Sequence, residues 1–254
     1  MLLCGLGNDI LPKMKLGIVI PCFNESKKLN PLVFQHFLDR HQEVQLCFVN
    51  DGSTDTTYNI LEDLKLSHSK HIHLIHLDQN SGKASAVQTG VLFFCNQNEC
   101  DRVAFLDGDL STSLEECYEL ATHLNSETKF IFASRIKKID NQINRQWHRF
   151  IIGRILATFI SKLLQLPIYD TQCGCKIFSL ELITIAFEKP FLSRWLFDVE
   201  VFFRLKNHFG SEQLIQFSKE IALKNWEDKG DSKIPWSYGL TVWGDLIKIY
   251  NQYK

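Results

Sequence analysis

The chain has 254 residues, of which 45% are hydrophobic and 22% are charged, and its formal net charge is −1. This is the composition of an ordinary globular protein, and the length is sufficient for one large hydrophobic core. A net charge this close to zero gives no basis for a general nucleic-acid-binding protein, so we expect no nucleic-acid partner.

Strand and helix patterns alternate through the first half of the chain. Four apolar runs have the length and composition of buried strands, at 16–21, 44–49, 72–77 and 103–106. Helical patterns separate them, at 29–37, 56–66 and 84–94. This alternation favours right-handed βαβ units, and therefore an α/β fold with a mostly parallel central sheet flanked by helices.

Polar clusters follow three of the predicted strands. Asn24 and Glu25 come after the first strand, residues 51–55 after the second and residues 107–109 after the fourth. Ligands bind beyond the carboxyl ends of the strands in sheets of this kind, so we expect a site there. We interpret Asp55 mainly as a cap of the following helix, and Asp51, at the strand tip, as a site residue.

The segment Asp107-Gly108-Asp109 is the most informative of these clusters. Two carboxylates separated by one glycine can turn toward the same hard cation, such as Mg²⁺ or Mn²⁺. A metal ion held at a strand end could then bind a diphosphate. An ordinary acidic turn would have the same three residues, and the motif alone does not separate the two interpretations.

The second half of the chain is less regular, and it contains no repeat or low-complexity linker, which favours a single compact domain. The predicted features are a strand at 130–134 followed by Arg135, a helix at 150–166, a turn at 170–174, an apolar segment at 196–205, a short strand at 220–223 and a polar loop at 227–233.

The predicted helix at 150–166 has two interpretations that the sequence leaves open. Arg149, Arg154 and Lys162 could meet anionic lipid headgroups while the apolar side chains contact a membrane surface. Alternatively, the helix belongs to the core or to a subunit interface. Its wide apolar stripe consists of Ile151, Ile152, Ile155, Leu156, Phe159, Ile160, Leu163 and Leu164.

Several other protein classes are disfavoured. No Gly-x-Gly-x-x-Gly motif follows the first strand, and the phosphate-loop-like segment 81–84 has Leu77 in place of the first glycine and Ala84 in place of the Mg²⁺-binding Ser or Thr.

The eight cysteines form no disulfide framework in a chain of this length, so we expect reduced thiols in a cytoplasmic protein. Cys173 and Cys175 lack the spacing of a zinc site. Asp9 and Lys13 interrupt the N-terminal apolar residues, so we expect neither a signal peptide nor a transmembrane helix.

Four blocks in the first half carry a family resemblance. IVIPCFNE (18–25), VNDGSTD (49–55), NSGKASA (80–86) and LDGD (106–109) resemble, in order and spacing, the successive motifs of family 2 glycosyltransferases. Three later blocks, DTQCGCKIF (170–178), WLFDVE (195–200) and GDSK (230–233), resemble those of the dolichyl-phosphate glucosyltransferases, with the dolichyl-phosphate mannose synthases as near relatives. On this basis we divide the chain into an N-terminal extension (1–14), a catalytic domain (15–240) and a C-terminal helical tail (241–254).

The resemblance implies the GT-A nucleotide-sugar-binding fold and an inverting hexose transfer to a polyprenyl phosphate of the dolichyl type, with UDP-glucose or GDP-mannose as donor. It also implies roles for particular residues. Asp107 and Asp109 would hold Mg²⁺ or Mn²⁺; Pro21, Glu25 and Asp51 would surround the base and ribose, with Lys83 nearby; Arg135, Arg149 and Lys233 would face the phosphates. An acceptor phosphate is already ionised and needs no strong general base, so we expect Asp198 and Asp170 to bind the sugar or support the site rather than to act as catalytic bases.

The chain departs from the family pattern in three places. Ser111 stands where the mannose synthases have a glutamine that helps to hold the metal, so the third protein ligand is undefined. Cys175 replaces an aromatic residue, and the N-terminal membrane helix of the eukaryotic glucosyltransferases has no counterpart in the sequence. We expect a cytoplasmic protein that binds peripherally to the inner face of a membrane.

Two alternative functions remain open at this stage. One is a family 2 enzyme that acts on a soluble or cell-envelope glycan, and the other is an inactive protein that only binds nucleotide sugars. The sequence does not define the donor, the lipid or the oligomeric state.

Overall fold

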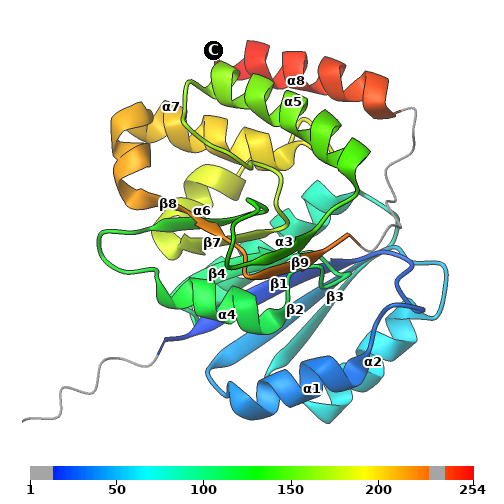
Figure 1. Cartoon of the computed structure of the whole chain (residues 1–254). Helices are drawn as coiled ribbons and strands as arrows, with labels where there is room; N and C mark the ends of the chain where they lie inside the picture. Colours follow the sequence, from blue (N-terminus) through cyan, green and yellow to red (C-terminus); the bar gives the residue numbers. More distant parts are fainter. Residues whose placement is uncertain (1–13, 229–237) are drawn as a thin grey trace, which may run out of the picture.

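A seven-stranded sheet forms the centre of the protein, with the strand order β3-β2-β1-β4-β7-β5-β8 (Figure 1). The computed structural model describes residues 14–228 and 238–254. All neighbouring strands in this sheet are parallel except β7, which is antiparallel to both β4 and β5. The strands are β1 (Leu16–Cys22), β2 (Val44–Asp51), β3 (Ile72–Leu77), β4 (Arg102–Leu106), β5 (Phe130–Ser134), β7 (Cys175–Ser179) and β8 (Ser218–Ala222). A separate parallel pair joins β6 (Gln142–Asn144) to β9 (Asn225–Glu227).

Helices cover both faces of the sheet (Figure 1). On one face pack α1 (Pro31–Arg40), α2 (Thr57–Ser67) and α4 (Leu114–Thr122). On the other pack α3 (Lys83–Gln97), α6 (Leu180–Phe187) and α7 (Phe197–Phe217), with α5 (Trp147–Leu164) and α8 (Tyr238–Tyr253) outside them. The alternation of side chains along a strand feeds both cores, since Ile18 and Ile20 belong to the first and Val19 to the second.

The predicted α/β class and mostly parallel sheet are confirmed, as are all six predicted strands. The sequence analysis missed β7, because it assigned only a turn within 168–178. This strand enters the sheet between β4 and β5 and brings Gly174 beside the end of β4, where the Asp107 amide donates to the Gly174 carbonyl (3.0 Å). The missed strand is therefore one wall of the predicted site.

The outermost helices, α5 and α8, contribute only part of their surfaces to the core. Ile160 and Leu164 of α5 and Leu246 and Ile249 of α8 are fully buried or nearly so. Within the described residues, no helix is both long enough and apolar enough to cross a membrane.

Candidate active site

The site lies at the carboxyl end of β4, between the ends of β1 and β7. The Asp107 backbone is fixed by its bond to Gly174, and the Asp109 carboxylate accepts a hydrogen bond from the Ser111 amide (2.9 Å). The Pro21 carbonyl, at the end of β1, lies against Gly108. The two carboxylates therefore sit on a short turn whose backbone is held from both sides.

Lys83 adds a positive charge to this turn. It is the first residue of α3, and its Nζ forms an ion pair with Asp107 Oδ1. Burial lowers the pKa of Lys83, but the attraction of Asp107, Asp198 and Asp109 outweighs it, so the pKa is raised and the ammonium group stays charged. The structure thus brings together four of the predicted site residues.

Asp51 holds the loop that leads into α3. Its carboxylate is buried and accepts hydrogen bonds from the amides of Ser81 (2.7 Å) and Gly82 (2.8 Å). Glu25 lies in the loop after β1, and its amide donates to Thr57 Oγ1 (2.8 Å) at the start of α2. The Asp55 carboxylate accepts a hydrogen bond from the Thr57 amide (3.0 Å) in the first turn of α2, so it stabilises the start of this helix, but the N-cap residue itself is Thr56.

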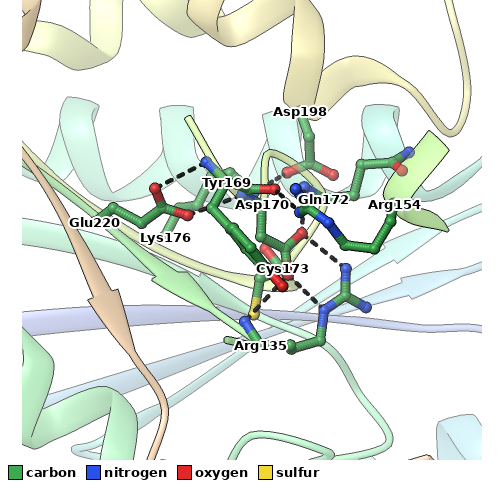
Figure 2. Close-up of polar contacts among 9 residues, drawn as sticks. All are labelled: Arg135, Arg154, Tyr169, Asp170, Gln172, Cys173, Lys176, Asp198 and Glu220. Carbon is green, nitrogen blue, oxygen red and sulfur yellow. Dashed lines mark hydrogen bonds and ion pairs between the residues drawn. The ribbon is translucent and has the colours of Figure 1, made fainter. Parts of the chain in front are cut away.

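Arg135 and Asp170 form a buried, bidentate ion pair beside the site (Figure 2). The Nε of Arg135 donates to Asp170 Oδ2 (2.7 Å) and its Nη2 donates to Oδ1 (2.9 Å). Burial raises the pKa of Asp170, but the guanidinium outweighs it and holds the pKa well below its usual range. Two of the guanidinium nitrogens that we expected to face phosphates are thus engaged by Asp170, which supports the structural role considered for that aspartate.

A second buried ion pair supports Asp198 from behind. Lys176 is fully buried, and its Nζ donates to Asp198 Oδ1 (2.5 Å) and to the Cys173 carbonyl (2.8 Å). Farther along α7, Glu200 pairs with Arg204 (2.8 Å). Asp198 and Glu200 therefore do not lie on a solvated helix face, because each acidic side chain is buried against a basic partner.

Some predicted residues are not joined to this cluster. Lys233 and the side chain of Arg149 lie outside the described residues. Arg154 turns back toward the sheet, where it stacks 3.5 Å from the Tyr169 ring centroid and donates to the Tyr169 carbonyl (2.6 Å), as Figure 2 shows. The expectation that Arg154 faces lipid headgroups is therefore wrong.

Sequence reasoning also missed supporting residues. Glu220 on β8 accepts hydrogen bonds from the amides of Tyr169 (2.9 Å) and Asp170 (2.8 Å), and so fixes the loop that carries Asp170. Lys176 had a usable signal, because a lysine inside the apolar run 175–178 must find a buried anion. Glu220 had no such signal in the sequence, since its partners are the backbone amides of residues 51 and 50 positions away.

The residues at the end of β4 fit a divalent cation that is completed by substrate. No group of three or more His, Cys, Asp or Glu side chains within 14–228 and 238–254 could hold a metal. Mg²⁺, however, typically uses one or two carboxylates together with phosphates and water. Asp107 already binds a cationic group, the Lys83 ammonium, at the position where such an ion would bind.

Comparison with known proteins assigns the class. The fold is that of the GT-A glycosyltransferases. The chain superposes on the glucosyl-3-phosphoglycerate synthase of Mycobacterium tuberculosis, which was crystallised with Mn²⁺, UDP-glucose and glycerol 3-phosphate. The TM-score is 0.64 at 15% identity, over 94% of this chain and 81% of that one. The family model described as glycosyl transferase family 2 matches residues 17–184. The chain therefore belongs to glycosyltransferase family 2.

Curated relatives align over most of the chain. A dolichyl-phosphate beta-glucosyltransferase of Trichomonas vaginalis is 27% identical over 91% of this chain and 69% of its own length. The human dolichyl-phosphate beta-glucosyltransferase is 26% identical over 95% and 76%, respectively. An undecaprenyl-phosphate 4-deoxy-4-formamido-L-arabinose transferase of Proteus mirabilis is 27% identical over 66% and 50%. The resemblance inferred from the sequence blocks is confirmed.

Proposed function

We propose that this glycosyltransferase moves a hexose from a nucleotide-diphosphate sugar, UDP-glucose or GDP-mannose, to a polyprenyl phosphate. The observation that carries the proposal is the pair of carboxylates, Asp107 and Asp109, held beside Lys83 at the carboxyl end of β4. The acceptor class is supported by the names of the relatives, which act on dolichyl or undecaprenyl phosphate.

The chemistry requires opposite charges around two phosphorylated substrates. A divalent cation bound by Asp107 and Asp109 would neutralise charge on the leaving nucleoside diphosphate. Lys83 and Arg135 supply positive charge to this site, and Arg135 lies close enough to Asp107 for their charges to interact. We assign Pro21, Glu25 and Asp51 to the base and ribose side, Asp198 to the sugar side, and Arg149 and Lys233 to the phosphates.

The acceptor needs no strong general base. A phosphate monoester has a second pKa of about 6 and is largely a dianion at neutral pH. One of its oxygens attacks the anomeric carbon as the bond to the donor diphosphate breaks, and the electron pair leaves with the nucleoside diphosphate. This fits a site in which the acidic side chains Asp170 and Asp198 are already paired with Arg135 and Lys176.

We further propose that the face formed by α5 and α8 contacts the membrane that holds the acceptor. The two helices lie side by side on the far side of the molecule from α1 and α2 (Figure 1), and the rings of Phe159 and Trp243 meet edge to face with centroids 5.4 Å apart. A contiguous apolar patch of this extent on the solvent-exposed surface of a protein commonly marks a contact with another protein or with a membrane. Its exposed residues are Trp147, Phe150, Ile151, Ile152, Ile155, Phe159, Trp243 and Ile247.

The α5 helix also connects this face to the site. Arg154, on α5, binds the Tyr169 carbonyl, and the next residue, Asp170, binds Arg135. A lipid chain lying along the exposed side of α5 would therefore bring its phosphate toward the loop that carries Asp170 and its partner Arg135. Lys162 on the same helix and Lys248 on α8 are exposed or partly exposed cations that suit anionic headgroups.

The reaction is tested by offering the purified protein a panel of nucleotide sugars, with Mg²⁺ or Mn²⁺ and a short polyprenyl phosphate, and analysing the products for a glycolipid. We expect glycolipid from one donor, and we expect Asp109→Asn or added EDTA to abolish it because a hard anionic ligand or the cation is lost. Asp63→Asn, a change of an exposed aspartate on α2, is the control and should retain activity. Full activity of Asp109→Asn would contradict the metal assignment, and transfer only to a soluble sugar would contradict the lipid acceptor.

The membrane surface is tested with Ile152→Asp and Phe159→Asp in liposome sedimentation. Both side chains are more than half exposed, so both variants should fold, and a charge introduced at the bilayer interface should weaken binding. Leu66→Asp, at an exposed leucine of α2, is the matched control and should bind as the wild type does. Unfolding of the two α5 variants, or unchanged binding, would show that this face does not contact lipid. Hydrolysis of the donor in solution should survive all three changes.

A further inference from the structure

The position of Lys83 is built into the loop that precedes α3. Gly82 has a φ of +96°, and a Cβ at this position would collide with the Arg194 side chain, so only glycine fits. Asp51 binds the Gly82 amide from one side, and the Ala84 amide donates to the Arg194 carbonyl (3.2 Å) on the other. Hydrogen bonds therefore hold the backbone on both sides of Lys83, and its side chain extends to Asp107.

Lys83 has two acidic partners within its reach. Its Nζ pairs with Asp107 Oδ1, and Asp198 is the next strongest charge acting on it. The centroid of the ring of Phe197, the residue before Asp198, lies 5.8 Å from Nζ. Asp198 is itself held in place by its ion pair with Lys176, so it offers Lys83 a second, well-fixed carboxylate.

We propose that Lys83 is an internal cation that occupies the metal position on Asp107 in the free enzyme and moves to Asp198 when a divalent cation binds. This inference rests on the proposed metal site at Asp107 and Asp109.

The physical argument is competition for one oxygen. A divalent ion and an ammonium group repel each other strongly at contact distance, so both cannot bind the same Asp107 oxygen. The ion must therefore displace Lys83, which weakens the binding of the metal alone. Donor diphosphate adds negative charge to the site, which compensates for the extra cation, and so metal and donor should bind together more tightly than either binds alone.

The test is a titration of the protein with Mn²⁺ in the absence of nucleotide, in which the concentration of free Mn²⁺ is measured by electron paramagnetic resonance. Lys83→Gln removes the competing charge and should bind Mn²⁺ at least about tenfold more tightly than the wild type. Lys83→Arg keeps the charge and should stay within about threefold of the wild type. Lys129→Gln removes a lysine that pairs with Glu181 and not with any of the three aspartates Asp107, Asp109 and Asp198, and it should change nothing.

The outcomes separate this inference from the proposed function. If the wild type binds Mn²⁺ and Lys83→Gln binds it no more tightly, Lys83 does not compete and the inference is wrong. If neither protein binds Mn²⁺, with or without nucleotide sugar, the metal site itself is wrong and the inference falls with it. If Lys83→Gln fails to fold, Lys83→Met, an uncharged variant of similar length, decides by the same titration. Adding Asp109→Asn to the Gln variant should abolish the gain, which verifies that the ion binds at this turn.

Discussion

Gly174 sets the position of a proposed metal ligand, and replacing it with alanine should move that ligand. A Cβ on residue 174 would lie 2.6 Å from Asp107 Oδ1 and closer still to the other carboxylate atoms. Ordinary non-bonded contacts between heavy atoms are about 3.5–4.0 Å, and the nearest carboxylate oxygen, Oδ2, would lie 2.0 Å from the added Cβ, so the Asp107 carboxylate must shift by about 1.5 Å. Gly174 has no freedom to withdraw, because its carbonyl accepts the Asp107 amide and β7 begins at the next residue.

A shift of this size should affect turnover far more than stability. A misplacement of about 1 Å in an active site can cost roughly a hundredfold in rate, and we expect Gly174→Ala to lose at least that much kcat. Overpacking in a well-packed region typically costs about 1–3 kcal/mol, so the variant should remain folded. Turnover is measured with saturating donor and acceptor, and stability by urea unfolding monitored by fluorescence.

The control is Gly244→Ala on α8, where an added Cβ meets no atom within 4 Å. Alanine is favoured over glycine inside a helix by about 1 kcal/mol, so this variant should be slightly more stable and fully active. Wild-type turnover in folded Gly174→Ala would refute the reasoning, since it would mean that the Asp107 carboxylate either does not lie against residue 174 or takes no part in the reaction.

Three further predictions concern stability. Asp170→Asn should lower the free energy of unfolding by about 3–5 kcal/mol in urea titrations, because it leaves the buried Arg135 guanidinium without its counter-ion. Glu181→Gln, in the exposed pair with Lys129, is the control and should cost less than about 1 kcal/mol. Similar losses in the two variants would contradict the burial argument. The pKa of Asp170 is lower in the folded state than its usual 3.8, so the stability that its carboxylate contributes is present above that pH and is lost below it. The difference in unfolding free energy between wild type and Asp170→Asn should therefore shrink as the pH of the urea titration falls from about 5 to 2. A difference that stays constant would show that the Asp170 carboxylate is not its origin. Burial raises the pKa of the Cys173 thiol to about 12, and the seven described cysteines are free, so added reductant should leave the melting temperature unchanged, and a large drop would reveal a disulfide.

The alternating strands and helices were predictable because their signal is local. An apolar run of four to eight residues bounded by polar clusters is visible in the sequence before the chain folds, and β1, β2, β3 and β4 all have it. The meeting of the polar clusters followed from the same pattern, since parallel strands place their carboxyl ends on one edge. Asp51 and Asp107 could therefore be assigned to one edge of the sheet, whereas Lys83 was assigned to the site only through the family resemblance.

The pairing of charges around that site was decided by the tertiary structure. Nothing local to Asp170 indicates that its partner is Arg135, and nothing local to Asp198 indicates Lys176, because these pairs form only when β7 enters the sheet between β4 and β5. The same holds for α5, whose apolar residues form one stripe in the sequence. Packing against α7 buries Ile160 and Leu164 and leaves Ile152 exposed, because a helix on the outside of a globule can bury only one side and the contacts of its neighbours determine which one.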